Sequence, residues 1–429
     1  MNKLEIVKQI VKVMAEDSST LKDTNEKNAE AFLSKISVTM SDGDFYKTVR
    51  TYLASFGVIS HLGFYQKTAR ANGFRLRRHG NSLYVISAAA ETGLCAGDEI
   101  LSIDGHSIVA FYNSHKDFFV SKTPERQFLD WSYVVKAAEQ LKLMRAGKVF
   151  SVKVADCLNE DYDKDFACYY INDETFYVKC QNFQDEEQLA NLYKECEAAF
   201  KSAKYLMIDV RVNNGGSDSL YFPFLKYALP SGVSLRDIDF PDDYDMEILH
   251  TKANVARRLA QFDEALSDPN ISLETRELIK EMSEDLKKNS GKGYVTYSED
   301  LSENLPDLLG IEQSPEQIYV LSDVYCGSSG DNFVAMMKAM PKVTVVGRPT
   351  LGILDYSNCC SIDFDDYVFV YPTSRSLAID HGKGMTDIGV LPDLEIPWTT
   401  QHLTEDIDLK VVLEKIEEGK GQDDKTNSR

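Results

Sequence analysis

Residues 317–337 read QIYVLSDVYCGSSGDNFVAMM, and this stretch decides how the rest of the chain is interpreted. Residues 318–324 are apolar and β-branched over a length that is typical of a buried strand. From Phe333 to Met340, apolar side chains recur at the spacing of an amphipathic helix. The residues between them, GSSGD at 327–331, therefore predict a tight turn from a strand into a helix.

A strand-to-helix turn of this kind has two interpretations. It lifts a side chain clear of the sheet and points the free N–H groups of the helix N-terminus at whatever binds there. That arrangement suits a serine nucleophile with developing negative charge beside it. The other interpretation is a serine that only caps the helix. On the turn alone both interpretations stay open, and other parts of the chain must decide.

The composition limits the classes of protein to which the chain can belong. Its 429 residues, of which 43% are hydrophobic, are enough for two or three domains with full cores. The net charge of −21 argues against a nucleic-acid partner, because phosphate binding needs a basic face. No apolar run approaches a bilayer span, so we expect no membrane partner. Residues 1–19 predict an amphipathic helix rather than a signal peptide.

The cysteines and histidines show no metal-binding spacing. The eight cysteines include no CxxC pair, and without an export signal we expect free thiols in a reducing cytoplasm. The seven histidines include no HExxH motif, and no stretch resembles a phosphate pocket, so we expect neither a metal nor a cofactor. Ser60 and His61 lie in an apolar stretch, where a histidine is usually a satisfied core residue.

The pattern of residues divides the chain into four parts. They are an N-terminal helical region (1–70), a unit of short strands and turns (71–156), an α/β core (157–400) and a charged C-terminal segment (401–429). In the second part we expect a helix at about 127–145. In the core, residues 240–310 predict an acidic two-helix insert or lid. After Ile416 we expect no regular structure, because the residues are charged and rich in Gly and Asp.

One motif in the second part resembles the hallmark of PDZ domains. Residues 91–105 read ETGLCAGDEILSIDG, in which glycines supply turns and aliphatic residues fill the core. In such domains a peptide C-terminus adds as a strand beside a carboxylate-binding loop. The resemblance implies that residues 73–76 take that place, with Phe74 and Leu76 as peptide-binding residues.

The order of motifs resembles the serine peptidase family of the tail-specific and tricorn core proteases, with the PDZ-like unit placed as in that family. The matching pieces are DVRVNNGG (209–216), the serine turn (327–331), VVGRPTLG (345–352) and GVLPD (389–393). The resemblance implies an α/β fold, namely a Clp-protease/crotonase-like β-α superhelix with an inserted PDZ-like domain. It extends over about residues 45–400, outside the helical insert.

The same resemblance implies roles for individual residues. In the tricorn-like branch a Ser-His pair before the PDZ domain supplies the base, and Ser60-His61 matches it. In the other branch a lysine follows the T-x-G turn, but this chain has Ile353 there. The nucleophile falls on Ser328 when the turn is anchored at Gly347, His61 acts as general base, and Ser60 orients the imidazole.

Two further roles are the donors that bind the oxyanion and the carboxylate that supports the histidine. The resemblance implies that backbone N–H groups of Gly215 or Gly216 and of Ser329 meet the oxyanion. The branch carries a glutamate three residues before the closing Gly-Val, where this chain has Thr386. The adjacent Asp387 is the candidate replacement. His106 and His381 are further bases in the sequence, with exposed loop positions as the alternative.

These inferences predict a cytoplasmic serine endopeptidase of the tricorn-like branch that acts on short peptides or unfolded proteins. A homo-oligomer is an open alternative to a monomer, because the family often assembles. The rival from another class is a PDZ-containing peptide-binding protein that keeps the fold but has lost turnover. Its motivation is the absence of both the expected glutamate, at Thr386, and the lysine, at Ile353.

Overall fold

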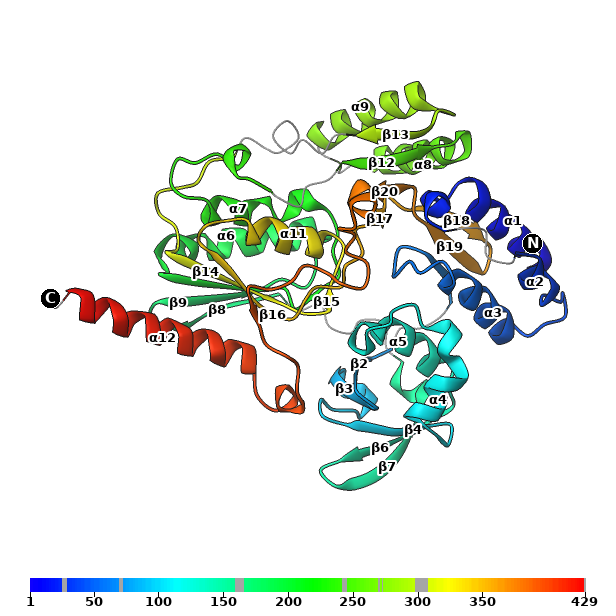
Figure 1. Ribbon diagram of the computed structural model, residues 1–429, viewed down its shortest axis with the longest axis horizontal. Coiled ribbons are helices and arrows are strands. Elements are labelled where there is room, and N and C mark those ends of the chain that lie inside the picture. The colour runs from blue at the N-terminus through cyan, green and yellow to red at the C-terminus, as the bar shows by residue number, and fades with distance from the viewer. Residues whose placement is uncertain are drawn as a thin grey trace.

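A six-stranded sheet lies in the left half of Figure 1, between two layers of helices. The computed structural model describes residues 1–24, 29–68, 72–158, 166–240, 245–268, 271, 273–297 and 308–427. The sheet has the order β21-β16-β14-β10-β9-β8, and all neighbouring strands are parallel except β8 and β9. The strands are β8 (Ala167–Asn172), β9 (Thr175–Lys179), β10 (Tyr205–Asp209), β14 (Gln317–Ser322), β16 (Val343–Gly347) and β21 (Leu394–Glu395).

Helices cover both faces of this sheet, which explains why its central strands are continuous apolar runs. On one face lie α6 (Glu186–Ser202), α7 (Phe222–Ala228) and α11 (Ser329–Lys338), and on the other lies α12 (Ile407–Asn427) (Figure 1). The strand at 318–324 and the helix after it, both expected from the sequence, are β14 and α11. The serine turn therefore lies at the carboxyl end of a central parallel strand.

Helix α12 corrects the expectation of no regular structure after Ile416, because it continues to Asn427. Val412 and Ile416 are buried against the sheet and anchor the helix there. The residues that follow include Glu, Lys and Gln, which are good helix formers once a helix has started. The charged composition of the segment gives no sign that these two apolar residues are buried.

The N-terminal helices pack on a separate three-stranded sheet. They are α1 (Lys3–Glu16), α2 (Ala29–Ser34) and α3 (Asp42–Ala54), and the strands are β1 (Gly63–Gln66), β18 (Cys360–Phe364) and β19 (Tyr367–Tyr371). Strand β1 pairs with β19, so segments about 300 residues apart share one core. Because His61 lies just before β1, this pairing places it close to residues 350–357.

Residues 72–158 form a unit with its own core, which we call the 72–158 unit. Its sheet has the order β2-β3-β4-β6-β7, with β5 beside β4. The elements are β2 (Phe74–His79), β3 (Ser82–Ala88), β4 (Glu99–Ile103), β5 (His106–Ser107), α4 (Ile108–His115), α5 (Phe128–Lys136), β6 (Gln140–Arg145) and β7 (Lys148–Lys153).

One expectation for the 72–158 unit is wrong, because the helix expected at 127–145 ends at Lys136 and residues 140–145 form β6. Strand β6 pairs with β7 through Ala146 and Gly147, both of which have positive φ. A two-residue turn of that kind matches the twist of a hairpin.

The 240–310 insert contains the two expected helices, α8 (Lys252–Leu266) and α9 (Leu273–Asn289). It also contains two strands that were not expected, β12 (Met246–His250) and β13 (Gly293–Tyr297). Strand β12 pairs with β20 (Ser374–Ser376), which pairs with β17 (Tyr356–Ser357). This sheet ties the insert to the segment beside His61. Residues 241–244 and 298–307 of the insert lie outside the described residues.

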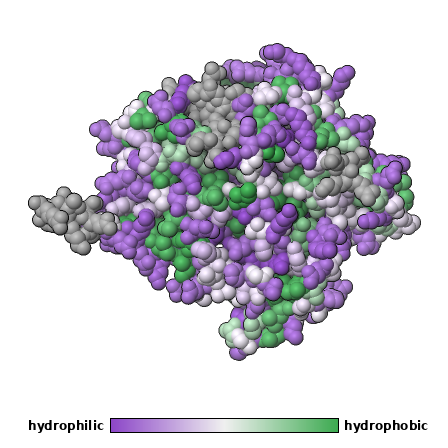
Figure 2. Space-filling model, viewed as in Figure 1, coloured by the Kyte–Doolittle hydropathy of each residue, from purple (hydrophilic) through white to green (hydrophobic). Residues whose placement is uncertain are grey.

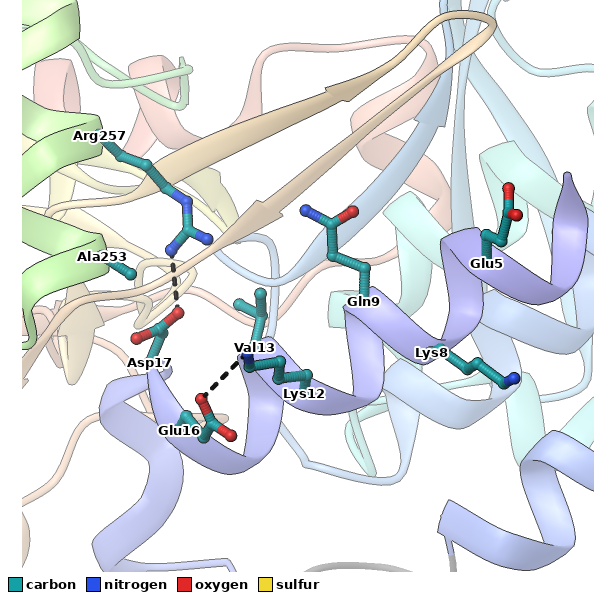
Figure 3. A pocket seen from close by; sticks show the side chains of 9 residues that line it. All are labelled: Glu5, Lys8, Gln9, Lys12, Val13, Glu16, Asp17, Ala253 and Arg257. Carbon is teal, nitrogen blue, oxygen red and sulfur yellow. Dashed lines mark hydrogen bonds and ion pairs between the residues drawn. The ribbon is translucent and has the colours of Figure 1, made fainter. Parts of the chain in front are cut away.

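The surface is mostly polar. Figure 2 shows hydrophilic residues over most of the visible face, with apolar residues in small groups. A pocket of about 470 Å³ lies between α1 and α8 and is lined by charged residues such as Lys12 and Arg257 (Figure 3). None of the residues that the sequence predicted for the site lines it. No helix in the described ranges has the length and apolar character needed to cross a membrane.

Candidate active site

The glycine turn and the serine turn lie side by side. Short strand β11 (Val212–Asn213) pairs in parallel with β15 (Tyr325–Cys326), and the Gly327 N–H donates to the Asn213 carbonyl at 3.0 Å. Asn213 is buried, and its side-chain amide donates to the Cys180 carbonyl at 3.0 Å. The ends of β10 and β14 are thereby held together, although 113 residues separate Ser329 from Gly216.

Both glycines of the first turn are required by their surroundings. Gly215 has φ +73°, and a Cβ added to it would lie 2.6 Å from the Cβ of Ser328. Gly216 has φ +148°, and its added Cβ would lie 1.9 Å from the Phe183 carbonyl oxygen. A side chain at Gly215 would push the turn away from Ser328, and one at Gly216 would push it away from Phe183.

Ser328 has the backbone and the exposure of a reactive side chain. Its φ of 60° and ψ of −126° lie in a region that residues with a side chain rarely occupy, at a cost of about 1–3 kcal/mol. The side chain is half-buried, and within the described part of the chain its hydroxyl donates no hydrogen bond. By contrast, Ser329 is buried and its hydroxyl donates to the Gly216 carbonyl at 2.8 Å. Of the two serines, Ser328 has the available hydroxyl.

Asp331, the third residue of α11, ties the serine turn to the segment after β16. One carboxylate oxygen accepts from the N–H of Ser328 at 2.8 Å and from the N–H of Ile353 at 3.1 Å. The other accepts from the N–H of Gly352 at 2.9 Å. Burial raises the pKa of Asp331, and these donors oppose the shift. Sequence reasoning assigned no role to this side chain, although an acid three residues after an N-cap serine is a capping-box signal.

The imidazole of His61 meets the same segment. Its Nδ1 lies 2.5 Å from the carbonyl oxygen of Tyr356, and the Ile353 backbone also acts on the pKa of the ring. A carbonyl oxygen only accepts, so Nδ1 carries the proton and the neutral ring keeps its lone pair on Nε2. Burial lowers the pKa of His61, and the two backbone acceptors oppose this shift. The neutral form, which is the form a general base needs, is therefore favoured.

The segment 352–356 connects the histidine to the serine. The N–H of Ile353 donates to Asp331, which also accepts from Ser328, and the carbonyl of Tyr356 accepts from His61. The Ile353 side chain is buried and would lie 3.2 Å from a Cβ added to Gly327. Residues 352–356 thus hold the turn that bears the serine and the segment that bears the histidine. The structure brings Ser328, His61 and the glycine turn into one region.

Two of the predicted residues have partners other than those expected. Asp387, at φ +64°, accepts hydrogen bonds from the Ser121 hydroxyl and the Lys122 N–H, both in the 72–158 unit. Its carboxylate therefore faces that unit instead of Ser60. The Nδ1 partner of His61 is a carbonyl, so the expected role of Ser60 in orienting the ring stays a prediction.

Thr386 binds a carboxylate that sequence reasoning missed. Its N–H and its hydroxyl donate to the same oxygen of Asp355, at 2.7 and 2.6 Å. Asp355 is buried and directly precedes Tyr356. Asp355 belongs to no recognisable sequence motif, and it meets Thr386 only because of how the loop folds.

The predicted oxyanion donors differ in availability. The Gly215 N–H donates to the Asn213 side chain at 2.9 Å. Gly216 is exposed, and within the described residues its N–H has no hydrogen-bond acceptor. Ser329 is the first residue of α11, where backbone N–H groups have no partner in the helix. Gly216 and Ser329 thus offer the two available N–H groups.

The predicted peptide-binding residues lie in β2. The side chains of Phe74 and Leu76 are buried in the core of the 72–158 unit. The Leu76 carbonyl accepts from the Tyr325 hydroxyl at 2.9 Å, so this strand contacts the serine strand directly. The alternative bases, His106 and His381, are both exposed. No group of three or more metal-ligating side chains occurs within the described ranges.

Comparison with known proteins gives one family and a set of similar structures. Residues 174–396, more than half of the chain, match the family model described as Peptidase family S41. The structure of mature CPAF is 12% identical, with a TM-score of 0.63 and 94% of each chain covered. Mature CPAF complexed with lactacystin is 11% identical, with a TM-score of 0.64 and coverage of 94% of this chain and 95% of that one. At these identities the likeness shows the fold.

Proposed function

The chain belongs to peptidase family S41, and from that premise we propose that it is a serine-type endopeptidase with Ser328 as nucleophile and His61 as general base. The observation that carries the proposal is the convergence on residues 352–356, where Tyr356 accepts from His61 and Ile353 binds the aspartate that holds the Ser328 turn. The available hydroxyl of Ser328 and the neutral state of His61 agree with it. The use of a histidine base that follows a serine, as in Ser60-His61, assigns the proposed mechanism to the tricorn-like branch of the family.

In the proposed reaction, Nε2 of His61 takes the proton of the Ser328 hydroxyl as the oxygen attacks the peptide carbonyl. The imidazolium that forms keeps its Nδ1–H on the Tyr356 carbonyl and then gives the other proton to the leaving amine. Water repeats the cycle on the acyl-enzyme. The strained backbone of Ser328 keeps its hydroxyl clear of the sheet.

The oxyanion of the tetrahedral intermediate is assigned to the N–H groups of Gly216 and Ser329. This narrows the sequence prediction, because the Gly215 N–H already has an acceptor in Asn213. Two backbone donors with a helix N-terminus behind one of them suit a developing negative charge. Loss of one such donor costs about 3 kcal/mol of transition-state stabilisation.

We also propose that the 72–158 unit is a PDZ-like domain inserted before a β-α superhelix core, and that it binds the C-terminus of the substrate. The five-strand order of the unit and its glycine turns at Gly93, Gly97 and Gly105 support this. Because Phe74 and Leu76 are buried, they would contact a peptide through the main chain of β2. The substrates are peptides or unfolded proteins.

The second candidate is a peptide-binding protein without turnover. The observation that favours it is the carbonyl at His61 Nδ1, where many serine peptidases place a carboxylate. Asp387, the predicted replacement, faces Ser121.

Digestion of a broad peptide library separates the two candidates. The first predicts internal cleavage by the wild-type protein, with loss of cleavage in both Ser328→Ala and His61→Ala and retention in Ser329→Ala at a reduced rate. The second predicts saturable peptide binding, measured by fluorescence anisotropy, without any product. Cleavage that persists in Ser328→Ala would overturn the first candidate.

A further inference from the structure

Asp355 is a buried carboxylate that the proposed mechanism does not use. It is 4% exposed, and its oxygens accept from the Met385 N–H at 2.9 Å and from the N–H and hydroxyl of Thr386. Within the described residues it forms no ion pair with Lys, Arg or His. A buried carboxylate held only by neutral donors costs desolvation energy.

The carboxylate lies one residue before the group that orients His61. Tyr356, next in the chain, provides the carbonyl that accepts from Nδ1. The Asp355 main chain is held as well, because its carbonyl accepts from the Ser376 N–H at 2.9 Å. The side chain and the main chain of Asp355 therefore fix the residue directly before Tyr356, whose carbonyl is the His61 acceptor.

A second buried carboxylate holds the other end of the same segment. Asp331 binds the N–H groups of Gly352 and Ile353, and also the N–H of Ser328. Residues 352–356 are thus held at one end by the carboxylate beside the nucleophile and at the other by Asp355. The hydrogen bond of His61 Nδ1 goes to this segment.

The loop that binds Asp355 fits closely. A Cβ added to Gly384 would lie 3.0 Å from an Asp355 carboxylate oxygen, and one added to Gly352 would lie 2.2 Å from the Met385 carbonyl oxygen. The loop at 384–386 therefore contacts both ends of the held segment. A shift of this loop would be transmitted to the Tyr356 carbonyl.

We propose that Asp355, bound by the Thr386 hydroxyl, is the positioning residue for the general base. It holds the Tyr356 carbonyl at Nδ1 of His61, which fixes the tautomer and aims Nε2 toward Ser328. This inference rests on the proposed function of Ser328 and His61. In this proposal the carboxylate that serves the histidine is Asp355, which acts on His61 through the main chain of Tyr356.

The test compares Asp355→Asn and Thr386→Val with two controls. Thr386→Ser keeps the hydroxyl and should restore the wild-type rate. Asp104→Asn removes a carboxylate that likewise accepts from two successive N–H groups, those of Glu139 and Gln140, but in the 72–158 unit. Peptidase rates are measured on a peptide from the library digest, and the imidazole N–H signal that His61→Gln removes is followed by ¹⁵N-edited NMR.

We expect kcat to fall roughly 10- to 100-fold in Asp355→Asn and Thr386→Val, with KM within about twofold, since misplaced catalytic groups lower kcat by such factors. The His61 N–H signal should shift or disappear in both, and Thr386→Ser and Asp104→Asn should match the wild type. If Asp355→Asn does not fold, Thr386→Val gives the answer. Unchanged kcat and an unchanged His61 signal in Thr386→Val would overturn the inference. The His61 N–H signal is measured without substrate, so it tests the positioning role of Asp355 even if the wild-type protein cleaves no peptide. Absence of cleavage by the wild-type protein would refute the proposed function instead.

Discussion

Gly215 lies directly against Ser328: a Cβ on Gly215 would lie only 2.6 Å from the Cβ of the serine. The backbone of the glycine turn is therefore one wall of the site around the hydroxyl. This contact joins two motifs that lie more than 100 residues apart in the sequence. It also makes the position of the serine sensitive to the smallest change in the turn.

Gly215→Ala should lower kcat/KM at least about 100-fold, because the added methyl group would displace Ser328. In addition, alanine disfavours a backbone with φ +73°. The rate is measured on a library peptide. Gly80→Ala is the control, since Gly80 also has positive φ but nothing within 4 Å of an added Cβ. Equal losses in both variants would mean that backbone strain alone, rather than the contact with Ser328, explains the effect.

Asp331→Asn should reduce both activity and stability, since the amide keeps one acceptor and turns N–H groups toward backbone donors. Hydrogen bonds to charged groups contribute about 1.5–3 kcal/mol each, so we expect the free energy of unfolding to fall by at least about 2 kcal/mol. Urea unfolding measures the stability, and the rate of a library peptide measures the activity. A stable variant with wild-type activity would show that the three bonds of Asp331 do not hold the site.

The pH dependence of activity should reflect His61. Only the neutral imidazole accepts the serine proton, so kcat/KM rises as pH increases through the pKa of the free enzyme. Burial lowers that pKa from its ordinary value of 6.5. We therefore expect the midpoint of the acidic limb to lie below 6.5, with near-maximal activity at neutral pH. A midpoint above 6.5 in the pH profile of kcat/KM would contradict this account of the histidine.

A buried ion-pair chain behind the serine strand should contribute to stability. The Asp323 carboxylate binds Arg77 of β2 at 2.9 Å and Arg348 at 2.7 Å. Burial raises the pKa of Asp323, but the two guanidinium groups outweigh it and hold the pKa well below its usual range. Its stabilisation is present at neutral pH and is lost as the pH falls through the lowered pKa.

Asp323→Asn should therefore lower the free energy of unfolding by about 1.5–3 kcal/mol at pH 7, because each of two buried arginines loses one charged partner. Arg77 keeps Glu125 and Arg348 keeps Asp408. Chemical unfolding at pH 7 measures the difference. Asp363→Asn serves as control, since Asp363 and its partner Lys67 are both exposed and such pairs contribute about 0–1 kcal/mol. If both variants lose the same small amount, the buried chain adds little to stability.

The sequence allowed prediction of those parts of the site that depend on local pattern. The strand before the serine turn, the helix after it and the glycine turn all follow from periodicity and turn residues. The partners of Asp331 and Asp355 could not be predicted, because Ile353 and Thr386 reach them only through tertiary contacts. The place of Asp387 in the sequence makes it the candidate carboxylate, but the folded loop turns it toward Ser121.

The errors in secondary structure have the same origin. The short apolar pattern of β6 fits a helix as well as a strand, and pairing with β7 makes it a strand. Helix α12 was missed because two apolar residues in a charged segment gain their stability only against the sheet. In both cases a partner distant from the segment fixes its structure.

Active-site labelling tests the central claim, the pairing of Ser328 with His61, most directly. A fluorophosphonate probe is incubated with the wild-type protein, and the modified residue is identified by peptide mass spectrometry. We predict that the probe modifies Ser328, that Ser328→Ala abolishes labelling, and that His61→Ala slows it at least about 1,000-fold. Labelling of Ser328→Ala at the wild-type rate, or no effect of His61→Ala, would contradict the assignment.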